Sequence, residues 1–360
     1  MHDDVCVTHL LFPSFVFISK INFKNTRGMG FSSEWVSIMK GVVREAFTVE
    51  KNTPNLRGAF IDGQIQLMKS QFVTTMDMFY RIQFANIINK YLKEGTDDMV
   101  VVLAFDDYNN VPASKSMTQM RRKQRVVDAL LFTEQDTIPT GNCPPNWDGA
   151  MCNRAFKTKL IRKITEVMGG MITLRGQQRV IVDFIGDPIE YSTKPGGSTI
   201  VGSDSPCYGR YMTGFAPVGE ADCKMPRWVD YISSLHPNRA VDVVVEATDS
   251  DYILIAMLHY EKQSQYVSMD GAGLGRVILR RIKCKDKEAP VPKAAKKPTV
   301  RPKREMEYVH VPLLCEVMSK LMVELFDGGT PMQCLTAIVA LGGKPSIVCN
   351  FLRMFVENVS

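Results

Sequence analysis

The chain has 360 residues, of which 45% are hydrophobic and 23% are charged, and its formal net charge is +6. These values are ordinary for a globular protein and allow one large core or two modest ones. No run approaches about 20 apolar residues, which excludes a membrane-spanning helix, and the nine cysteines form no CxxC pair or zinc-spaced cluster. We therefore expect a reduced, intracellular protein with no membrane partner.

Most of the positive charge lies in one segment. Residues 283–304 contain nine Lys or Arg and two acids, and their Pro, Lys and Ala content is typical of a solvated linker or inserted loop. The rest of the chain is close to neutral, so we expect no globally basic body. Residues 296–304 resemble a nuclear-localisation signal or a nonspecific nucleic-acid patch, and a charged disordered loop is an equally good interpretation.

Helical and strand patterns alternate along the chain. The first 28 residues look like an extension, because Met29 resembles a natural start and leads into a helix with Ser32 or Ser33 as its N-cap. Further helices are expected at residues 74–95, 115–131, 154–167, 219–235, 308–326 and 331–341. Strands are expected to end at residue 62 and to span residues 99–105, 181–191 (with a turn at 186–188) and 241–245, whereas residues 196–214 have the composition of a loop. This alternation predicts an α/β fold with a mainly parallel central sheet flanked by helices, and a helical C-terminal region.

Six acids gather where the expected strands end or a helix begins. They are Asp62 and Asp106 at strand ends, Glu220 and Asp222 at the start of a helix, and Asp249 and Asp251 after the strand at residues 241–245. In open α/β sheets, ligands bind outside the carboxyl ends of the strands, so we expect the six to converge there. A single Asp after a strand is usually a turn residue or helix cap, but capping does not explain two pairs of acids spaced one residue apart.

Converged carboxylates repel one another unless cations neutralise them. Hard divalent ions bind through oxygen, and Mg²⁺ is the usual choice, with Mn²⁺ as the alternative. Two such ions about 4 Å apart can orient an attacking water and stabilise the leaving oxygen of a phosphodiester. The pattern therefore predicts a metal-dependent phosphodiesterase with two Mg²⁺ ions bound by the six acids.

The order of these motifs resembles the flap endonuclease/XPG superfamily of structure-specific 5′ nucleases, which has a PIN-like fold. MGF at Met29 resembles the family's MGI start, FDDYNNVPASK its FDG…P…K segment, GEADCK its GEAD or EAEA, and ATDSDYILI its (S/T)xDxD. The resemblance covers roughly residues 29–258, with weaker signs to about residue 343. It implies that Asp62 and Asp106 are the first two metal carboxylates and that the enzyme is an endonuclease or exonuclease. Related members include 5′→3′ exoribonucleases and virus-encoded nucleases.

The resemblance also implies a domain organisation. Residues 29–282 would form the catalytic domain, with a basic helical arch at about residues 110–170. Residues 283–305 would be the basic linker or loop, and residues 306–360 would complete the nuclease fold with helices.

Two basic segments, residues 114–125 and residues 154–163, fall in the expected arch. Residues 114–125 hold five positive charges and no acid, and Lys115 and Arg122 lie seven apart, on one face of a helix. The resemblance implies that these two are catalytic and hold the scissile phosphate, since a Lys charge and an Arg fork both stabilise negative phosphoryl oxygens. A solvated basic helix face is the alternative interpretation. Contacts with nucleic acid are further expected from Arg121, Lys123, Arg125, Lys157 and Lys159.

The chain departs from the family pattern near its C-terminus. The family has a further Asp after a Gly-containing segment, where this chain has Lys344, and the helical motif that grips double-stranded DNA is not recognisable. Three functions therefore stay open: a DNA flap endonuclease or 5′ exonuclease, an RNA-degrading nuclease of the same fold, and a catalytically silent nucleic-acid-binding protein. The expected partner is branched or single-stranded DNA, or RNA, in the nucleus or cytoplasm, with the nucleus favoured by residues 296–304.

Overall fold

The structure is a computed structural model, and it describes a large part of the chain. The described residues are 44–48, 53, 56–68, 73–107, 132–185, 188–193, 199–202, 220–236, 241–247, 252–253, 255–257, 259–260, 276–282 and 306–326. Several predicted segments lie outside them, namely the extension at 1–28, the N-cap serines, the arch helix at 115–131, the linker at 283–305 and the helix at 331–341.

The strands of the described residues form one nine-stranded sheet in the order β1-β9-β8-β7-β2-β3-β4-β5-β6. In chain order they are β1 (Phe47–Thr48), β2 (Leu56–Asp62), β3 (Val100–Ala104), β4 (Arg179–Asp183), β5 (Ile189–Thr193), β6 (Thr199–Gly202), β7 (Asp242–Glu246), β8 (Arg276–Ile282) and β9 (Met306–His310). Strands β2, β3, β4 and β7 lie where the hydrophobic runs predict them.

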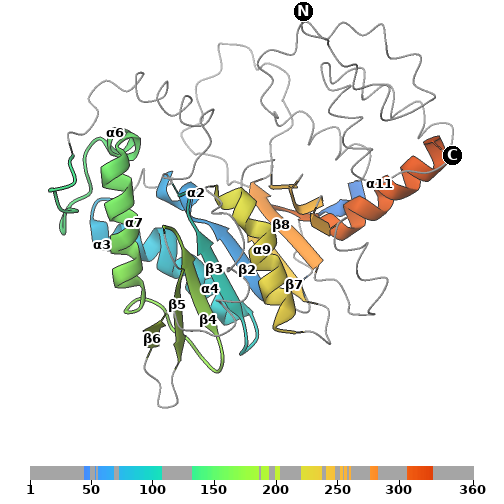
Figure 1. Ribbon diagram of the computed structural model, residues 1–360, viewed down its shortest axis with the longest axis horizontal. Helices are drawn as coiled ribbons and strands as arrows, with labels where there is room; N and C mark the ends of the chain where they lie inside the picture. The colour runs from blue at the N-terminus through green and yellow to red at the C-terminus, as the bar shows by residue number, and fades with distance from the viewer. Residues whose placement is uncertain are drawn as a thin grey trace, which may run out of the picture.

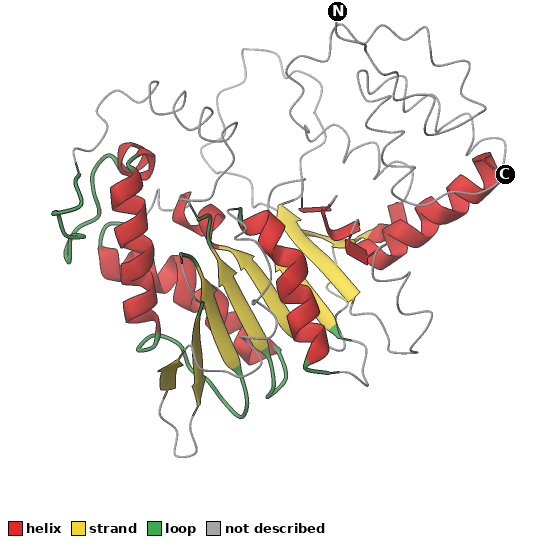
Figure 2. Ribbon diagram, viewed as in Figure 1, coloured by secondary structure: helices red, strands yellow, loops and turns green. Residues whose placement is uncertain are grey.

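Helices cover both faces of this sheet, as Figure 2 shows. They are η4 (Arg44–Ala46), α2 (Gly63–Met68), α3 (Met76–Tyr80), η5 (Arg81–Ala85), α4 (Asn86–Glu94), α6 (Trp147–Cys152), α7 (Arg154–Met168), α9 (Ala221–Ser234) and α11 (Val311–Phe326). The helix predicted at 74–95 is present as α3, η5 and α4, with η5 a π-helical segment between them. No helix in the described part of the chain is both long and apolar enough to cross a membrane.

The sheet is mixed, so the α/β prediction is confirmed and its mainly parallel character holds only for the centre. Neighbouring strands are parallel from β8 through β7, β2 and β3 to β4. At both margins the pairing is antiparallel, between β4, β5 and β6 on one side and between β8, β9 and β1 on the other. Short connections explain β5 and β6, because a short turn can join antiparallel strands but cannot make the crossover that parallel strands need.

The structure differs from the predicted elements in three places. Strand β6 lies inside the segment 196–214 predicted as a loop, β8 was not predicted, and β9 occupies residues 306–310, where a helix was expected from residue 308. The helix instead begins at Val311, with Pro312 in its first turn. Proline is well tolerated there because the first helical N–H groups have no partner within the helix. The segment after the basic linker therefore adds a strand to the same sheet before it becomes helical.

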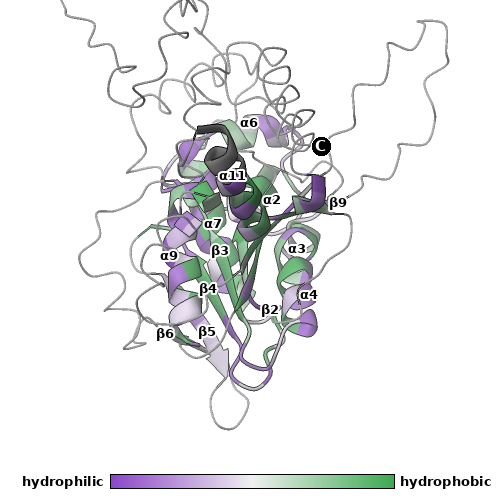
Figure 3. Ribbon diagram, turned by 90° about the vertical axis from the view of Figure 1, so that its right-hand side faces the viewer, coloured by the Kyte–Doolittle hydropathy of each residue, from purple (hydrophilic) through white to green (hydrophobic). Residues whose placement is uncertain are grey.

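Two apolar layers enclose the sheet. In β7, Val243 and Val245 face the layer beneath α9 and α11, whereas Val244 faces the layer formed with α3, η5, α4, α6 and α7. Successive strand side chains point to opposite faces, so a strand buried on both sides reads as a continuous apolar run. Figure 3 shows α9 on one side of the sheet and α3 and α4 on the other, and Figure 1 shows α9 lying across the sheet.

Candidate carboxylate site

Three acids lie at the carboxyl edge of the parallel strands. Asp62 ends β2, Asp183 ends β4, and Asp106 lies two residues beyond β3, which pairs with both. The residues two positions earlier, Phe60, Ala104 and Ile181, all belong to the core layer beneath α9. Since side chains alternate along a strand, the three acids lie on the face that α9 covers.

Asp62 is buried, with 7% of its surface exposed, and both its carboxylate oxygens accept hydrogen bonds. Oδ1 accepts from the backbone N–H groups of Gln64 (2.9 Å) and Ile65 (3.2 Å), which open α2. Oδ2 accepts from the Tyr252 hydroxyl at 3.0 Å. Asp62 therefore caps α2 on one side and is held by Tyr252 on the other.

The pKa of Asp62 is raised to about 6. Burial is the main cause, because removing water disfavours the charged form. The hydrogen bonds from Tyr252 and Ile65 act in the opposite direction, and the charge of Asp106 raises the pKa further. Asp62 is therefore a carboxylate without enough positive charge around it, next to a second acid.

Asp106 connects the edge of the sheet to α9. It is 7% exposed, and its Oδ1 accepts from the backbone N–H of Ala221, the first residue of α9, at 3.0 Å. The N-cap residue Glu220 makes no capping bond with its own side chain, so Asp106 supplies an acceptor from a neighbouring strand. This arrangement fixes the start of α9, which carries Asp222 in its first turn, against the strand ends.

Tyr252 lies among the acids. It is 1% exposed, and its pKa is raised by burial and then by the charges of Asp62 and Asp222, with a smaller effect from Asp106. The hydroxyl is therefore bonded to Asp62 and lies within electrostatic range of Asp106 and Asp222. The sequence prediction missed Tyr252, although its place directly after Asp251 in TDSDY was the available signal.

The third edge acid, Asp183, is neutralised within the protein. The Lys224 ammonium donates to Asp183 Oδ1 (2.7 Å) and to the carbonyl oxygens of Phe105 (2.9 Å) and Phe184 (3.2 Å), and Trp228 Nε1 donates to Asp183 Oδ2 (2.8 Å). Asp183 and Lys224 are both buried. Sequence reasoning missed this pair, whose signal is the spacing of four residues between Lys224 and Trp228 on α9.

Glu246, which ends β7, makes its polar contacts on the other face of the sheet. It faces the opposite layer, where it accepts from the Tyr91 hydroxyl at 2.6 Å and from Arg280 at 2.6 Å. At the carboxyl edge, the charge of Asp106 therefore acts on Asp62, and the charge of Asp222 acts on Tyr252.

For several other residues named in the sequence prediction, a place at this edge stays a prediction. Asp249, Asp251, Lys115, Arg121, Arg122, Lys123, Arg125 and Lys344 lie outside the described residues. Within the described part of the chain, no group of three or more His, Cys, Asp or Glu side chains lies close enough to hold a metal ion. The donors that are present are oxygen atoms of acids, which fits a hard divalent cation, and two of the six predicted ligands belong to the segment that is not described.

The two predicted nucleic-acid contacts on α7 have roles within the fold. Lys157 is buried, with 9% of its surface exposed. The Lys159 ammonium donates to the main-chain carbonyl of Asp136 at 2.6 Å and to that of Glu134, which ties residues 132–136 to α7. Binding of nucleic acid by these lysines stays a prediction.

Comparison with known proteins does not assign a function to this site. No family model matches the chain, and no curated protein sequence matches it at a significant level.

Proposed function

We propose that the chain is a Mg²⁺-dependent nuclease of the 5′-nuclease type, with a PIN-like fold and its site at the carboxyl edge of the parallel strands. The observation that carries the proposal is that Asp62, which accepts a hydrogen bond from the buried Tyr252 hydroxyl, has the acid Asp106 as a charged neighbour at the ends of the parallel strands, while the charge of Asp222 acts on the same hydroxyl. These acids come from two strands and a helix that are far apart in the sequence. They are three of the six acids that the motif order selects.

The chemistry of the donors supports the proposal. Asp62 and Asp106 are neighbouring buried acids, and a divalent cation would favour the charged form of Asp62, which burial and, to a smaller extent, the charge of Asp106 disfavour. When bound, Mg²⁺ supplies Lewis-acid activation of water and of a phosphoryl oxygen. Glu220, Asp249 and Asp251 would complete the ligand set, and Lys115 and Arg122 would bind the scissile phosphate.

The Lys224 cation at this edge is paired with a different acid, Asp183. The Lys224 ammonium is occupied by Asp183 and two carbonyl oxygens, so its charge is directed to the end of β4. Asp183 is thereby excluded from the proposed ligand set, because both of its oxygens accept bonds from α9.

The proposal is tested by cleavage of matched substrates with single-residue variants. We expect the wild-type chain to cleave a 5′-flap DNA in Mg²⁺, and Asp62→Asn, Asp222→Asn and Asp249→Asn each to lose more than about 100-fold of that rate, since each removes a charged ligand. Asp77→Asn, an exposed acid on α3 in an ion pair with Arg81, is the control and keeps the wild-type rate. Cleavage that survives all three site substitutions would refute the proposal.

The substrate is decided by the same assay. Single-stranded RNA and 5′-flap DNA of the same sequence are digested in parallel. Faster cleavage of flap DNA supports the DNA nuclease, and faster cleavage of RNA supports the RNA-degrading alternative.

A catalytically silent nucleic-acid-binding protein is the second candidate. Its support is the lack, among the described residues, of a complete group of acids that could hold a metal, together with Lys344 at the position of the family's late carboxylate. It predicts binding to branched DNA or RNA in a gel-shift assay with no cleavage in Mg²⁺ or Mn²⁺. Metal-dependent cleavage that the Asp62→Asn variant lacks would exclude it.

A further inference from the structure

Residues 132–136 form a short turn that packs against α7, and we call this segment the strap. The Asp136 N–H donates to the Thr133 carbonyl oxygen at 3.2 Å, which closes the turn. The Phe132 ring packs edge-on against the ring of Phe156 in the first turn of α7, with 5.2 Å between the ring centroids. An aromatic contact therefore fixes the first residue of the strap on the helix.

Two sets of polar contacts hold the rest of the strap. Within it, Oδ2 of Asp136 accepts from the backbone N–H of Thr133 at 2.6 Å and from the Thr133 hydroxyl at 2.8 Å. From α7, the Lys159 ammonium donates to the main-chain carbonyls of Glu134 and Asp136, at 2.6 Å for the latter. The bonds from Thr133 and, to a smaller extent, the charge of Lys159 lower the pKa of Asp136, so these contacts favour its ionised form.

Thr133 offers an accessible hydroxyl among acids. Thr133 and the three residues after it are all exposed, and acids follow it at the first and third positions, as Glu134 and Asp136. The other exposed threonines of the same loop, Thr137 and Thr140, have no acid in the three residues that follow them. A Ser/Thr protein kinase with a basic substrate groove selects hydroxyls that such acids follow, because the opposite charges hold the segment in the groove.

We propose that Thr133 is a phosphorylation site for a protein kinase of this acid-directed kind, and that its phosphate opens the turn of the strap. The kinase transfers the γ-phosphoryl group of ATP. A bond forms between Thr133 Oγ1 and phosphorus, the bond from phosphorus to ADP breaks, and the hydroxyl proton passes to the catalytic base of the kinase. The proposal concerns only the strap and α7, so it does not depend on the carboxylate site.

A phosphate on Thr133 acts against both sets of polar contacts. It adds a charge of about −1.5 to −2. The esterified oxygen has no hydrogen to donate to Asp136, and the new charge repels the Asp136 carboxylate. The Lys159 ammonium, which now binds two neutral carbonyls, gains a stronger acceptor because a charged partner adds Coulomb attraction to the hydrogen bond. The turn therefore loses the bonds that close it.

The site is tested by phosphorylating the full-length chain in vitro. The chain is incubated with ATP and an acid-directed protein kinase, and the modified residues are located by peptide mass spectrometry. We expect phosphate on Thr133 in the wild type and in the matched control Thr137→Val, and none at residues 132–140 in Thr133→Val. Glu134→Gln removes one of the acids that the kinase would read, and it should slow the transfer about 10-fold. A wild-type chain that stays unmodified at Thr133 would overturn the proposal.

Hydrogen exchange followed by mass spectrometry tests the effect on the strap. In the phosphorylated chain, we expect the backbone amides of Thr133 and Asp136 to exchange at least about 10-fold faster, since the turn that protects them is opened. Lys159→Met should speed exchange in the strap without any phosphate. Lys163→Met, which removes an exposed ion pair with Glu166 on the same helix, is the control and should leave that exchange unchanged. Strap amides that keep their rate after Thr133 is phosphorylated would overturn the opening of the turn.

Discussion

The two edges of the parallel sheet treat their acids in opposite ways. At the amino edge, Asp98 precedes β3 and is bonded by Arg57 of β2 and by the Thr96 hydroxyl, at 2.5 Å for the latter. Partial burial opposes ionisation of Asp98, but the bond from Thr96 and the charge of Arg57 outweigh it and lower the pKa of Asp98. At the carboxyl edge, burial raises the pKa of Asp62, and the charge of Asp106 raises it further.

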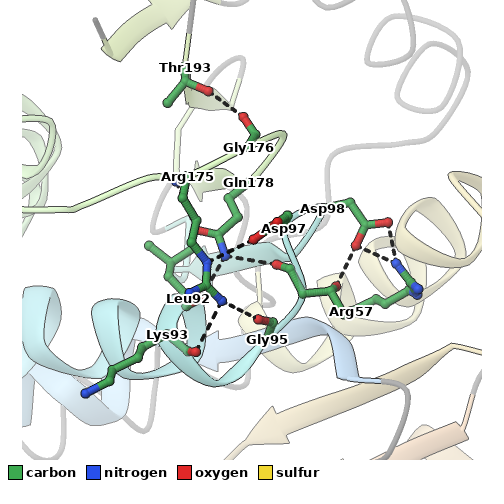
Figure 4. A network of polar contacts seen from close by, with 11 residues as sticks. Arg57, Leu92, Lys93, Gly95, Asp97, Asp98, Arg175, Gly176, Gln178 and Thr193 are labelled. Carbon is green, nitrogen blue, oxygen red and sulfur yellow. Dashed lines mark hydrogen bonds and ion pairs between the residues drawn. The ribbon is translucent and has the colours of Figure 1, made fainter. Parts of the chain in front are cut away.

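The amino edge is otherwise filled with satisfied polar groups, as Figure 4 shows. The Gln178 amide donates to the carbonyl oxygens of Leu92 (2.7 Å) and Thr96 (2.9 Å), and Arg175 donates to that of Gly95 (2.8 Å). These contacts tie the turn before β3 to the turn before β4. Hydrogen bonds that satisfy main-chain carbonyls in this way contribute to stability.

At the amino edge of the sheet, paired polar groups stabilise the fold. At the carboxyl edge, the sheet holds acids in an environment that disfavours their charge. Acids kept close together against their own repulsion cost stability, and such costs are characteristic of functional sites. Asp183 at the carboxyl edge allows a direct comparison with Asp62, since both oxygens of Asp183 accept hydrogen bonds from Lys224 and Trp228. Four changes test this division, from the largest expected effect to the smallest.

Removing the cation that pairs with Asp183 should have the largest effect. Lys224→Met removes the ammonium that pairs with the buried Asp183 carboxylate, and we expect a loss of about 3–5 kcal/mol in the free energy of unfolding. Urea denaturation followed by circular dichroism measures it. Lys163→Met, in an exposed ion pair with Glu166, is the control and should change the value by less than about 0.5 kcal/mol. A similar small loss in both variants would contradict the importance of the buried pair.

Neutralising Asp62 should stabilise the chain when no metal is present. Its pKa is about 6 in the folded chain against 3.8 for the free side chain, so ionised Asp62 costs stability above pH 6 and the cost disappears as the pH falls toward 4. We expect Asp62→Asn to gain about 1–3 kcal/mol at pH 8, from 1.36 kcal/mol per pKa unit, and to gain little at pH 4. Urea denaturation in EDTA at the two pH values measures this. A destabilised variant at pH 8 would show that Asp62 is mainly a cap of α2.

Gly176 tests the backbone of the amino edge. It has φ +56°, and an added Cβ would lie 2.9 Å from both the Cβ and the carbonyl oxygen of Asp97. We expect Gly176→Ala to lose about 1–3 kcal/mol, because non-glycine residues are strained in the left-handed region. Thermal unfolding measures the loss, and Gly141→Ala, where a Cβ would meet nothing within 4 Å, is the control. Equal melting temperatures for the two variants would contradict the strain.

Removing the charge of Asp98 should have the smallest effect. The Arg57–Asp98 pair is partly exposed, at 15% and 32% of the two side chains, so we expect Asp98→Asn to lose about 1 kcal/mol at pH 7. Because folding lowers the pKa of Asp98, the ionised side chain stabilises the folded chain at any pH above the pKa that Asp98 has in the unfolded chain. This stabilisation is lost as the pH falls through the pKa that Asp98 has in the folded chain. The difference between variant and wild type should therefore vanish in strong acid. A difference that persists there would assign the effect to packing.

Much of the fold follows from local patterns in the sequence. The run at residues 99–105 is β3, the run at 241–245 corresponds to β7, and the helices predicted at 154–167 and 219–235 are α7 and α9. These elements are predictable because their hydrophobic period and caps lie within a few residues of one another. The same reasoning placed Asp62 and Asp106 at strand ends, and parallel pairing then brings them to one edge.

The antiparallel margins and the division of the acids were decided by tertiary structure. Strand β9 forms because β8 and β1 offer partners on either side, and no pattern within residues 306–310 distinguishes it from the start of the helix that follows. Likewise, Asp62 and Asp183 are both aspartates at the end of a β-strand. One meets Tyr252 and a second acid, and the other meets Lys224 and Trp228. Sequence alone places acids at the edge, but their charge environment depends on side chains that come from distant parts of the chain.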